Sequence, residues 1–286
     1  MVVPITLSLE FTMAMNAINE TDFNAFLDSI RTTYGYDFTE YAESSLKRRI
    51  AYFMEMRKIE EVESLARLIL QDEHLFEEFV QEMSITVTEM FRDPSFYKTI
   101  REKLIERLAT YPVIKIWIAG CATGQEVYSL AILLKEHQLL ERTIIYATDI
   151  NQKSLRIAKE GVYPIENMKA YTENYLKAGG MQSFSEYYLA KYQSVMFDKS
   201  LRQNVVFAPH NLVTDRAFNE FQFIICRNVL MYFNQNLQRK VIDIFYESLS
   251  PFCFLGLGDK ESLLFSDKKP YFEEIDKKEK IYRKVL

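Results

Sequence analysis

The chain has 286 residues, of which 48% are hydrophobic and 26% are charged, and this composition is typical of a well-packed globular protein rather than a disordered one. Its formal net charge of −5 argues against a nucleic-acid partner, because surfaces that bind nucleic acid are basic. No apolar run approaches the roughly 20 residues that a membrane span needs, so we expect no membrane insertion.

The cysteines and the first residues indicate the compartment. The three cysteines, Cys121, Cys226 and Cys253, fit neither a disulfide framework nor a metal-ligand spacing, so we expect no metal and a reducing cytoplasm. The first fifteen residues are apolar, but they lack a basic leader and contain Glu10, so we expect no signal peptide.

Residues 21 to about 110 are expected to be helical. The stretch TDFNAFLDSI opens with a Thr-Asp capping signal and continues with apolar residues at helical spacing. EEVESLARLIL and HLFEEFVQEM follow with acidic first turns, which suit the N-terminus of a helix. We therefore expect an N-terminal helical domain, a small bundle, over residues 17–90.

From Val113 onward, short apolar runs alternate with helical segments. VIKIWIAG, RTIIYATDI, NVVFAPHNL, FQFIICRN and FCFLGLG are expected strands, and EVYSLAILLKEH, QKSLRIAKEG and NLQRKVIDIFYESL are expected helices. This alternation predicts an α/β domain over 91–286 with a parallel sheet covered on both faces. SEYYLAKYQSVMF predicts a small β-subdomain inserted at about 180–200, and the tail predicts a closing hairpin.

The turn after the first of these strands, in IWIAGCATGQEVYSL, contains Gly120 and Gly124. Glycines there allow positive φ and a close approach of the backbone to a ligand. Asp149 ends the second strand, where it could accept hydrogen bonds from ribose hydroxyls. The alternative is a plain tight turn, with Asp149 as the N-cap of a helix that begins at Asn151.

The identity of such a ligand follows from charge. The dinucleotide fingerprint G-x-G-x-x-G is absent, since the spacing is G-C-A-T-G. Glu126 at the start of the helix would repel a pyrophosphate and would suit a cationic ligand. S-adenosylmethionine carries a sulfonium, an ammonium and a ribose but no phosphate, so this turn favours it over NAD.

Six stretches together resemble the CheR family of chemotaxis receptor methyltransferases. In chain order they are TVTEMFRDPSFY (86–97), IWIAGCATGQEVYSLAI (116–132), ATDINQKSLRIAKEGVY (147–163), LRQNVVFAPHNL (201–212), FQFIICRNVLMYF (221–233) and LGLGDKESL (255–263). The resemblance implies a Rossmann-like S-adenosylmethionine-dependent methyltransferase sheet with an N-terminal helical domain and a small inserted antiparallel β-subdomain. It also implies S-adenosyl-L-methionine as cofactor and a glutamate side chain of a chemoreceptor's cytoplasmic domain as methyl acceptor.

Site residues are carried over from the family position by position. The cofactor contacts of the family fall on Thr86, Thr88, Arg92, Glu126, Asp149, Asn211, Leu212, Arg227 and Asn228. The residues expected to act on the acceptor are Arg92 and Tyr232. This chain departs from the family at Thr86, where Asn is usual, at Gln222, where Asp is usual, and in GDKE, where G-H-S-E is usual.

Structural alternatives exist for several of these residues. Arg227 and Asn228 follow an apolar strand, and they could enter a ligand crevice or brace a loop as a pair. Arg92 could pair with a neighbouring carboxylate, Glu89 or Asp93, on a solvated face. Tyr232 could be an ordinary core aromatic.

A glutamate acceptor is already ionised near pH 7, so the expected mechanism is positioning without a general base. LKRRIAYFMEMRK (46–58) is either a solvated basic face or, by resemblance, a docking surface for acidic receptor helices. We expect a monomer. Two alternatives remain: the same fold acting on another protein or a small molecule, and a non-catalytic module that binds the cofactor.

Overall fold

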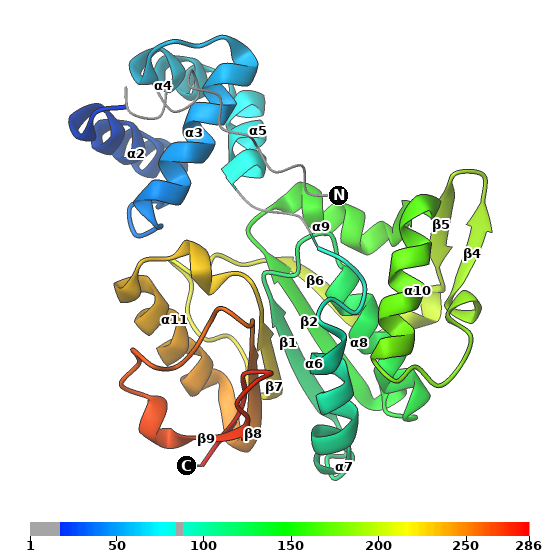
Figure 1. The fold of residues 1–286 in the computed structure, drawn as a ribbon. Helices are drawn as coiled ribbons and strands as arrows, with labels where there is room; N and C mark the ends of the chain where they lie inside the picture. The colour runs from blue at the N-terminus through cyan, green and yellow to red at the C-terminus, as the bar shows by residue number, and fades with distance from the viewer. Residues whose placement is uncertain (1–17, 84–87, 286) are drawn as a thin grey trace. The chain divides into compact units, whose positions relative to one another are not determined.

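The computed structural model describes residues 18–83 and 88–285, which form two compact units (Figure 1). The division falls between Ile85 and Thr86, and the short segment Tyr232–Leu237 groups with the N-terminal unit. Thr86 itself lies outside the described residues. None of the helices in the described part of the chain is long and apolar enough to cross a membrane.

The N-terminal unit is helical, as expected, with α2 (Glu20–Tyr34), α3 (Glu43–Arg57), α4 (Val62–Gln71) and α5 (Glu73–Met83). The start of α2 differs from the expectation. Its N-cap is Asn19, whose side chain accepts a hydrogen bond from the backbone N–H of Asp22 at 2.9 Å. The Thr-Asp pair therefore lies inside the first turn, because Asn19 supplies the better-placed oxygen.

Aromatic side chains form the centre of this helical core. Phe26 and Phe53 pack edge-on against Phe79, each with ring centroids 5.4 Å apart. Phe38 packs on the same ring at 6.0 Å. Such edge-to-face pairs contribute about 0.5–1.5 kcal/mol each beyond the area that they bury.

The second unit contains a seven-stranded sheet in the order β6-β2-β1-β7-β8-β10-β9. The first five strands in this order are parallel, and β10 runs antiparallel to both β8 and β9, which confirms the expected closing hairpin. The bounds are β1 (Ile114–Ala119), β2 (Thr143–Asp149), β6 (Val205–Pro209), β7 (Phe221–Cys226), β8 (Leu249–Leu257), β9 (Phe272–Asp276) and β10 (Ile281–Lys284).

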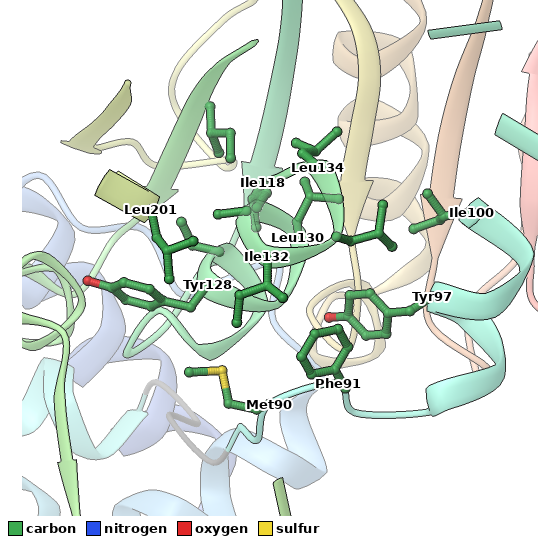
Figure 2. Close-up of a cluster of buried hydrophobic side chains, with 14 of the residues drawn as sticks. Met90, Phe91, Tyr97, Ile100, Ile118, Tyr128, Leu130, Ile132, Leu134 and Leu201 are labelled. Carbon is green, nitrogen blue, oxygen red and sulfur yellow. The ribbon is translucent and has the colours of Figure 1, made fainter. Parts of the chain in front are cut away.

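Helices cover both faces of this sheet. On one face, Ile118 of β1 lies in a buried cluster with Leu130 and Leu134 of the next helix and with Phe91 and Tyr97 (Figure 2). On the other face, Trp117 packs on Phe245 at 5.2 Å. The helices are α6 (Pro94–Thr99), the π-helix η1 (Ile100–Leu104), α7 (Ile105–Leu108), α8 (Gln125–Glu136), α9 (Gln152–Glu160), α10 (Met168–Lys177) and α11 (Gln235–Ser248).

A second, three-stranded antiparallel sheet has the order β3-β5-β4. It comprises β3 (Val162–Pro164), β4 (Tyr188–Lys191) and β5 (Ser194–Phe197), so the expected inserted subdomain gains a strand from just after α9. The 3-10 segments are η2 (Leu140–Arg142), η3 (Ile165–Asn167), η4 (Phe184–Tyr187), η5 (Lys199–Arg202), η6 (Leu230–Tyr232) and η7 (Lys269–Tyr271).

Glu136, the last residue of α8, ties this subdomain to the main sheet. Its side chain is 1% exposed and forms an ion pair with Arg101 of η1. It also accepts hydrogen bonds from the hydroxyl of Tyr175, from the hydroxyl of Tyr187 at 3.0 Å and from the backbone N–H of Met181 at 2.9 Å. One carboxylate therefore joins η1, α10 and η4.

Candidate functional site

Four parallel strands, β6, β2, β1 and β7, end at the same edge of the main sheet. Asp149 is the last residue of β2, and Gly120, Asn211 and Arg227 follow the other three strands, so the topology brings together much of the site expected from the sequence. In open parallel sheets this edge is the usual place for a ligand.

The turn after β1 is tied to the end of β2. The backbone N–H groups of Gly120 and Cys121 both donate to the carbonyl of Thr148, at 2.8 and 2.9 Å. Gly120 has a φ of 76° and Gly124, the N-cap of α8, has a φ of 93°. Both glycines thus adopt the left-handed conformation expected of them.

The space beside these glycines is filled by the protein itself. A Cβ on Gly120 would lie 2.4 Å from Cγ2 of Val229, and a Cβ on Gly124 would lie 2.7 Å from Cβ of Ala158. Absence of a side chain at these positions therefore lets the turn pack against the loop after β7 and against α9. The close approach of a ligand to this turn stays a prediction.

Asp149 points its carboxylate into the turn after β1. Oδ2 accepts the backbone N–H of Ala122 and Oδ1 accepts that of Asn151, each at 2.8 Å. The N-cap of α9 is Asn151, whose side chain accepts from the backbone N–H of Ser154 at 3.1 Å, so the alternative of Asp149 as cap is wrong. Burial raises the pKa of Asp149. The backbone hydrogen bonds lower it, but burial outweighs them, so the pKa is raised.

Glu126 lies in the first turn of α8 and is 9% exposed. Its Oε1 accepts a hydrogen bond from Nη1 of Arg227 at 2.9 Å and a longer one from the hydroxyl of Tyr97 at 3.4 Å. The helix start itself favours a negative charge. A buried carboxylate is thereby held at the carboxyl edge of β1.

Arg227 is enclosed by the protein, with a side chain that is 3% exposed. Besides Glu126 it binds the carboxylate of Asp93 at 2.5 Å and the carbonyl of Arg92 at 3.2 Å, and its guanidinium lies 4.2 Å from the ring centre of Phe96. Burial lowers the pKa of Arg227, but the nearby carboxylates more than offset it, so the pKa is raised. These contacts with protein groups are the ones that the bracing alternative predicts.

The stretch around Arg92 has an unusual backbone. Phe91 has a φ of 51° and Asp93 a φ of 54°, so Arg92 stands between two left-handed residues that are not glycine. The backbone N–H of Phe91 donates to Oγ of Ser129 at 2.8 Å, which fixes the stretch against α8. Residues held in such conformations cost about 1–3 kcal/mol each and cluster at functional sites. The carboxylate of Asp93 binds Arg227.

The loop after β6 holds Asn211 and Leu212. Its backbone is joined to the end of β2 by a hydrogen bond from His210 N–H to the carbonyl of Asp149 at 3.2 Å. The Oδ1 atom of Asn211 accepts from the backbone N–H of Val213 at 3.0 Å, and Leu212 is buried. Both expected residues thus follow a strand that ends at the candidate site.

The remaining expected residues are Thr86, Thr88 and Tyr232. Thr86 lies outside the described residues, and Thr88 is half-buried two residues before Met90. Tyr232 belongs to the N-terminal unit, where its carbonyl accepts the backbone N–H of Ala42 at 2.8 Å.

The sequence did not predict a role for Glu261. Asn228 has a φ of 60°, and its backbone N–H donates at 3.1 Å to the carboxylate of Glu261, which is 4% exposed. Burial raises the pKa of Glu261, while backbone hydrogen bonds lower it. The sequence GDKE differs from the G-H-S-E that is usual in the family, and this difference singled out the loop. Nothing in the sequence showed that its glutamate, Glu261, is buried.

The chemistry of this edge suits a cationic ligand with hydroxyl groups. Asp149 and Glu126 each place a carboxylate there, and carboxylates accept hydroxyl hydrogen bonds and attract positive charge. Within residues 18–83 and 88–285, no group of three or more His, Cys, Asp or Glu side chains could hold a metal ion.

Comparison with known proteins identifies the family. Residues 86–281 match the CheR methyltransferase, SAM binding domain, and residues 21–84 match the CheR methyltransferase, all-alpha domain. This chain belongs to the CheR methyltransferase family. As a CheR-family protein it is a methyltransferase that uses S-adenosylmethionine as its cofactor.

Several relatives of this CheR-family chain match over most of their length. It is 47% identical over 265 residues to Cher3 of Pseudomonas putida, whose name describes a methyltransferase, covering 93% of this chain and 97% of that one. A chemotaxis protein methyltransferase of Listeria innocua is 28% identical, covering 86% and 91%, and one of Vibrio parahaemolyticus is 30% identical, covering 85% and 88%. Among solved structures, the N-methyltransferase NodS of Bradyrhizobium japonicum, in complex with S-adenosylhomocysteine, is 13% identical with a TM-score of 0.34, covering 59% and 62%.

Proposed function

We propose that this chain transfers the methyl group of S-adenosylmethionine to glutamate side chains in the cytoplasmic domain of a chemoreceptor. The observation that carries the proposal is the joint match of both CheR domains, which together span residues 21–84 and 86–281. Relatives in Listeria innocua and Vibrio parahaemolyticus that bear the name chemotaxis protein methyltransferase support the chemotaxis role.

The proposed cofactor shell combines two carboxylates with the loops around them. Asp149 accepts the ribose hydroxyls, since its oxygens can each take a further hydrogen bond beside the backbone N–H already present. Glu126 lies near the positive end of the cofactor, and Arg227 keeps its carboxylate in place. The other residues of the proposed shell are Thr86, Thr88, Arg92, Asn211, Leu212 and Asn228.

The proposed acceptor chemistry needs no general base. Bound S-adenosylmethionine supplies a methyl group on a sulfonium, and a glutamate carboxylate is already ionised near pH 7. The protein therefore has to orient the carboxylate and exclude water, and good orientation can contribute on the order of 7–11 kcal/mol. We assign this role to Arg92 through its charge and to Tyr232 through its hydroxyl.

The basic stretch of α3 supports receptor docking only in part. Its five basic residues do not form one free positive face: Lys47 and Arg57 form ion pairs with glutamates of the same unit, and Arg49 donates to a backbone carbonyl. Arg48 and Lys58 are exposed. Docking of acidic receptor helices on α3 would therefore rest mainly on these two charges.

A methyl-transfer assay tests the function. The purified protein is incubated with tritiated S-adenosylmethionine and the cytoplasmic domain of a chemoreceptor from the same cell. We expect base-labile label on receptor glutamates, which is lost when those residues are changed to alanine. Arg92→Ala should lower kcat more than it weakens cofactor binding. Label found only on a small molecule or on another protein would refute the receptor proposal.

A further inference from the structure

Glu261 lies in the loop that follows β8, close to the carboxyl edge of the main sheet. It is a charged residue that is only 4% exposed, whereas glutamates are almost never fully buried unless they are paired. Its carboxylate is surrounded by backbone N–H groups of two loops. Such clusters of N–H groups form binding concavities for anions.

The hydrogen bonds divide evenly between the two oxygens. Oε2 accepts the backbone N–H groups of Gly258 at 2.7 Å and Asn228 at 3.1 Å. Oε1 accepts those of Val229 at 2.8 Å and Met231 at 3.3 Å. Three of the four donors belong to the loop after β7, so Glu261 fastens that loop to the loop after β8.

The fastened loop is closely fitted. Asn228 adopts a left-handed conformation with a φ of 60°, which is uncommon outside glycine but enriched in asparagine. A Cβ on Gly258 would lie 2.8 Å from Oε2 of Glu261 and 2.9 Å from the backbone nitrogen of Asn228. The two loops therefore meet with no space for an added methyl group.

The same loop contacts the candidate site on two sides. Arg227 binds the carboxylate of Glu126 at 2.9 Å. Val229 fills the space beside Gly120, where a Cβ would lie 2.4 Å from its Cγ2 atom. A shift of this loop would thus move both the guanidinium that holds Glu126 and the side chain that supports the turn after β1.

We propose that Glu261 is a positioning residue of the methyltransferase site, which acts by shaping the loop that carries Arg227, Asn228 and Val229. This inference rests on the proposed roles of Arg227 and Asn228 in the cofactor shell. A carboxylate is the side chain suited to the task, because both of its oxygens accept hydrogen bonds. A glutamine would turn an NH2 group towards two of the four N–H donors.

Glu261→Gln tests the inference, with binding of S-adenosylhomocysteine measured by calorimetry and KM and kcat measured with S-adenosylmethionine. We expect the Kd for S-adenosylhomocysteine and the KM for S-adenosylmethionine to rise about tenfold or more, because buried N–H groups lose their acceptor. Glu136→Gln is the matched control, since it makes the same change at another buried glutamate. That residue lies about 15 Å from Glu126 along α8.

Both variants are expected to melt at a lower temperature than the wild type, but only Glu261→Gln should lose affinity when both are measured while folded. Equal melting losses with a Kd within about twofold of wild type in both would overturn the inference. If Glu261→Gln does not fold, Glu261→Asp is measured instead. This variant keeps the charge, but its side chain is shorter by one methylene, so its oxygens lie farther from the four N–H donors. Wild-type affinity in that variant would also overturn it. Calorimetry needs no methyl acceptor, so failure of the receptor proposal would leave this comparison intact.

Discussion

Gly124 lies against Ala158 of α9, so that a Cβ on the glycine would be 2.7 Å from the Cβ and 2.9 Å from the Cα of Ala158. Because part of this contact is with backbone, it cannot be relieved by a change of rotamer. Gly124 also has a φ of 93°. We expect Gly124→Ala to lower the free energy of unfolding by about 2–4 kcal/mol, measured by urea denaturation.

Gly179→Ala separates crowding from backbone conformation. Gly179 has a φ of 78°, but its nearest neighbour is the Cδ atom of Arg101 at 3.6 Å, an ordinary contact. This control should cost only the conformational penalty of about 1–2 kcal/mol. Equal losses in the two variants would mean that the packing of Gly124 on α9 contributes nothing.

The ion pairs of Arg227 with Glu126 and Asp93 lead to a second prediction. Arg227→Met removes the cation and leaves the carboxylate of Glu126 buried without it. We expect a loss of about 3–5 kcal/mol in the free energy of unfolding, and weaker binding of S-adenosylhomocysteine. Arg283→Met, which breaks a pair with Glu273 whose side chains are 38% and 50% exposed, should cost no more than about 1 kcal/mol.

Burial of Asp149 predicts a pH dependence of cofactor binding. Its raised pKa means that, as pH falls, the folded protein takes up this proton at a higher pH than an ordinary aspartate would. The affinity for S-adenosylhomocysteine, measured by calorimetry, should therefore begin to fall above the usual aspartate range. Asp149→Asn should bind weakly and without this dependence; an unchanged affinity in the variant would exclude Asp149 from the site.

Thermal denaturation with each candidate ligand distinguishes S-adenosylhomocysteine from NAD. S-adenosylhomocysteine at about 100 times its Kd should stabilise the folded protein by about 2.7 kcal/mol, whereas NAD should not. Asp149→Ala should abolish this shift. A comparable shift with NAD would contradict the charge argument based on Glu126.

The carboxylate of Glu136 predicts an acid-sensitive contribution to stability. Burial raises its pKa, but hydrogen bonds from Tyr175, Met181 and Arg101 outweigh burial, so the pKa is lowered. A lowered pKa stabilises the folded state above the usual glutamate range, and this stabilisation is lost as pH falls through the lowered value. The difference in urea stability between wild type and Glu136→Gln should therefore shrink on acidification. A difference that is constant with pH would contradict this assignment.

Periodic features were the ones that the sequence could predict. Apolar spacing located the helices of the N-terminal unit and the strands of the sheet, and parallel strands ending in Asp149 and Arg227 predicted a common edge. Pairings between distant residues could not be predicted in this way. Arg227 and Glu126 are 101 residues apart, and Glu261 is 33 residues from Asn228, so only the folded chain shows that these side chains meet.

Two smaller features, the cap of α2 and the short strand β3, differ from the sequence prediction for separate reasons. Thr21 and Asp22 resemble a helix cap, but Asn19 lies one position before the helix and its side chain takes that role. The three-residue strand Val162–Pro164 is too short for an alternating pattern and forms because Met196, Val195 and Ser194 lie opposite to it. The cap was therefore decided by a neighbouring residue, and the strand by its tertiary partner.

The grouping of Tyr232–Leu237 with the N-terminal helices has a practical consequence for dissecting this enzyme. Asn234 N–H donates to the carbonyl of Glu40 at 2.8 Å, and Phe233 pairs with Tyr41 through an isolated bridge. Deleting the first 85 residues would therefore remove neighbours of the buried Phe233 ring and leave an exposed apolar surface on the fragment. The catalytic half should be prepared with its helical partner retained, or with Phe233 replaced by a polar residue.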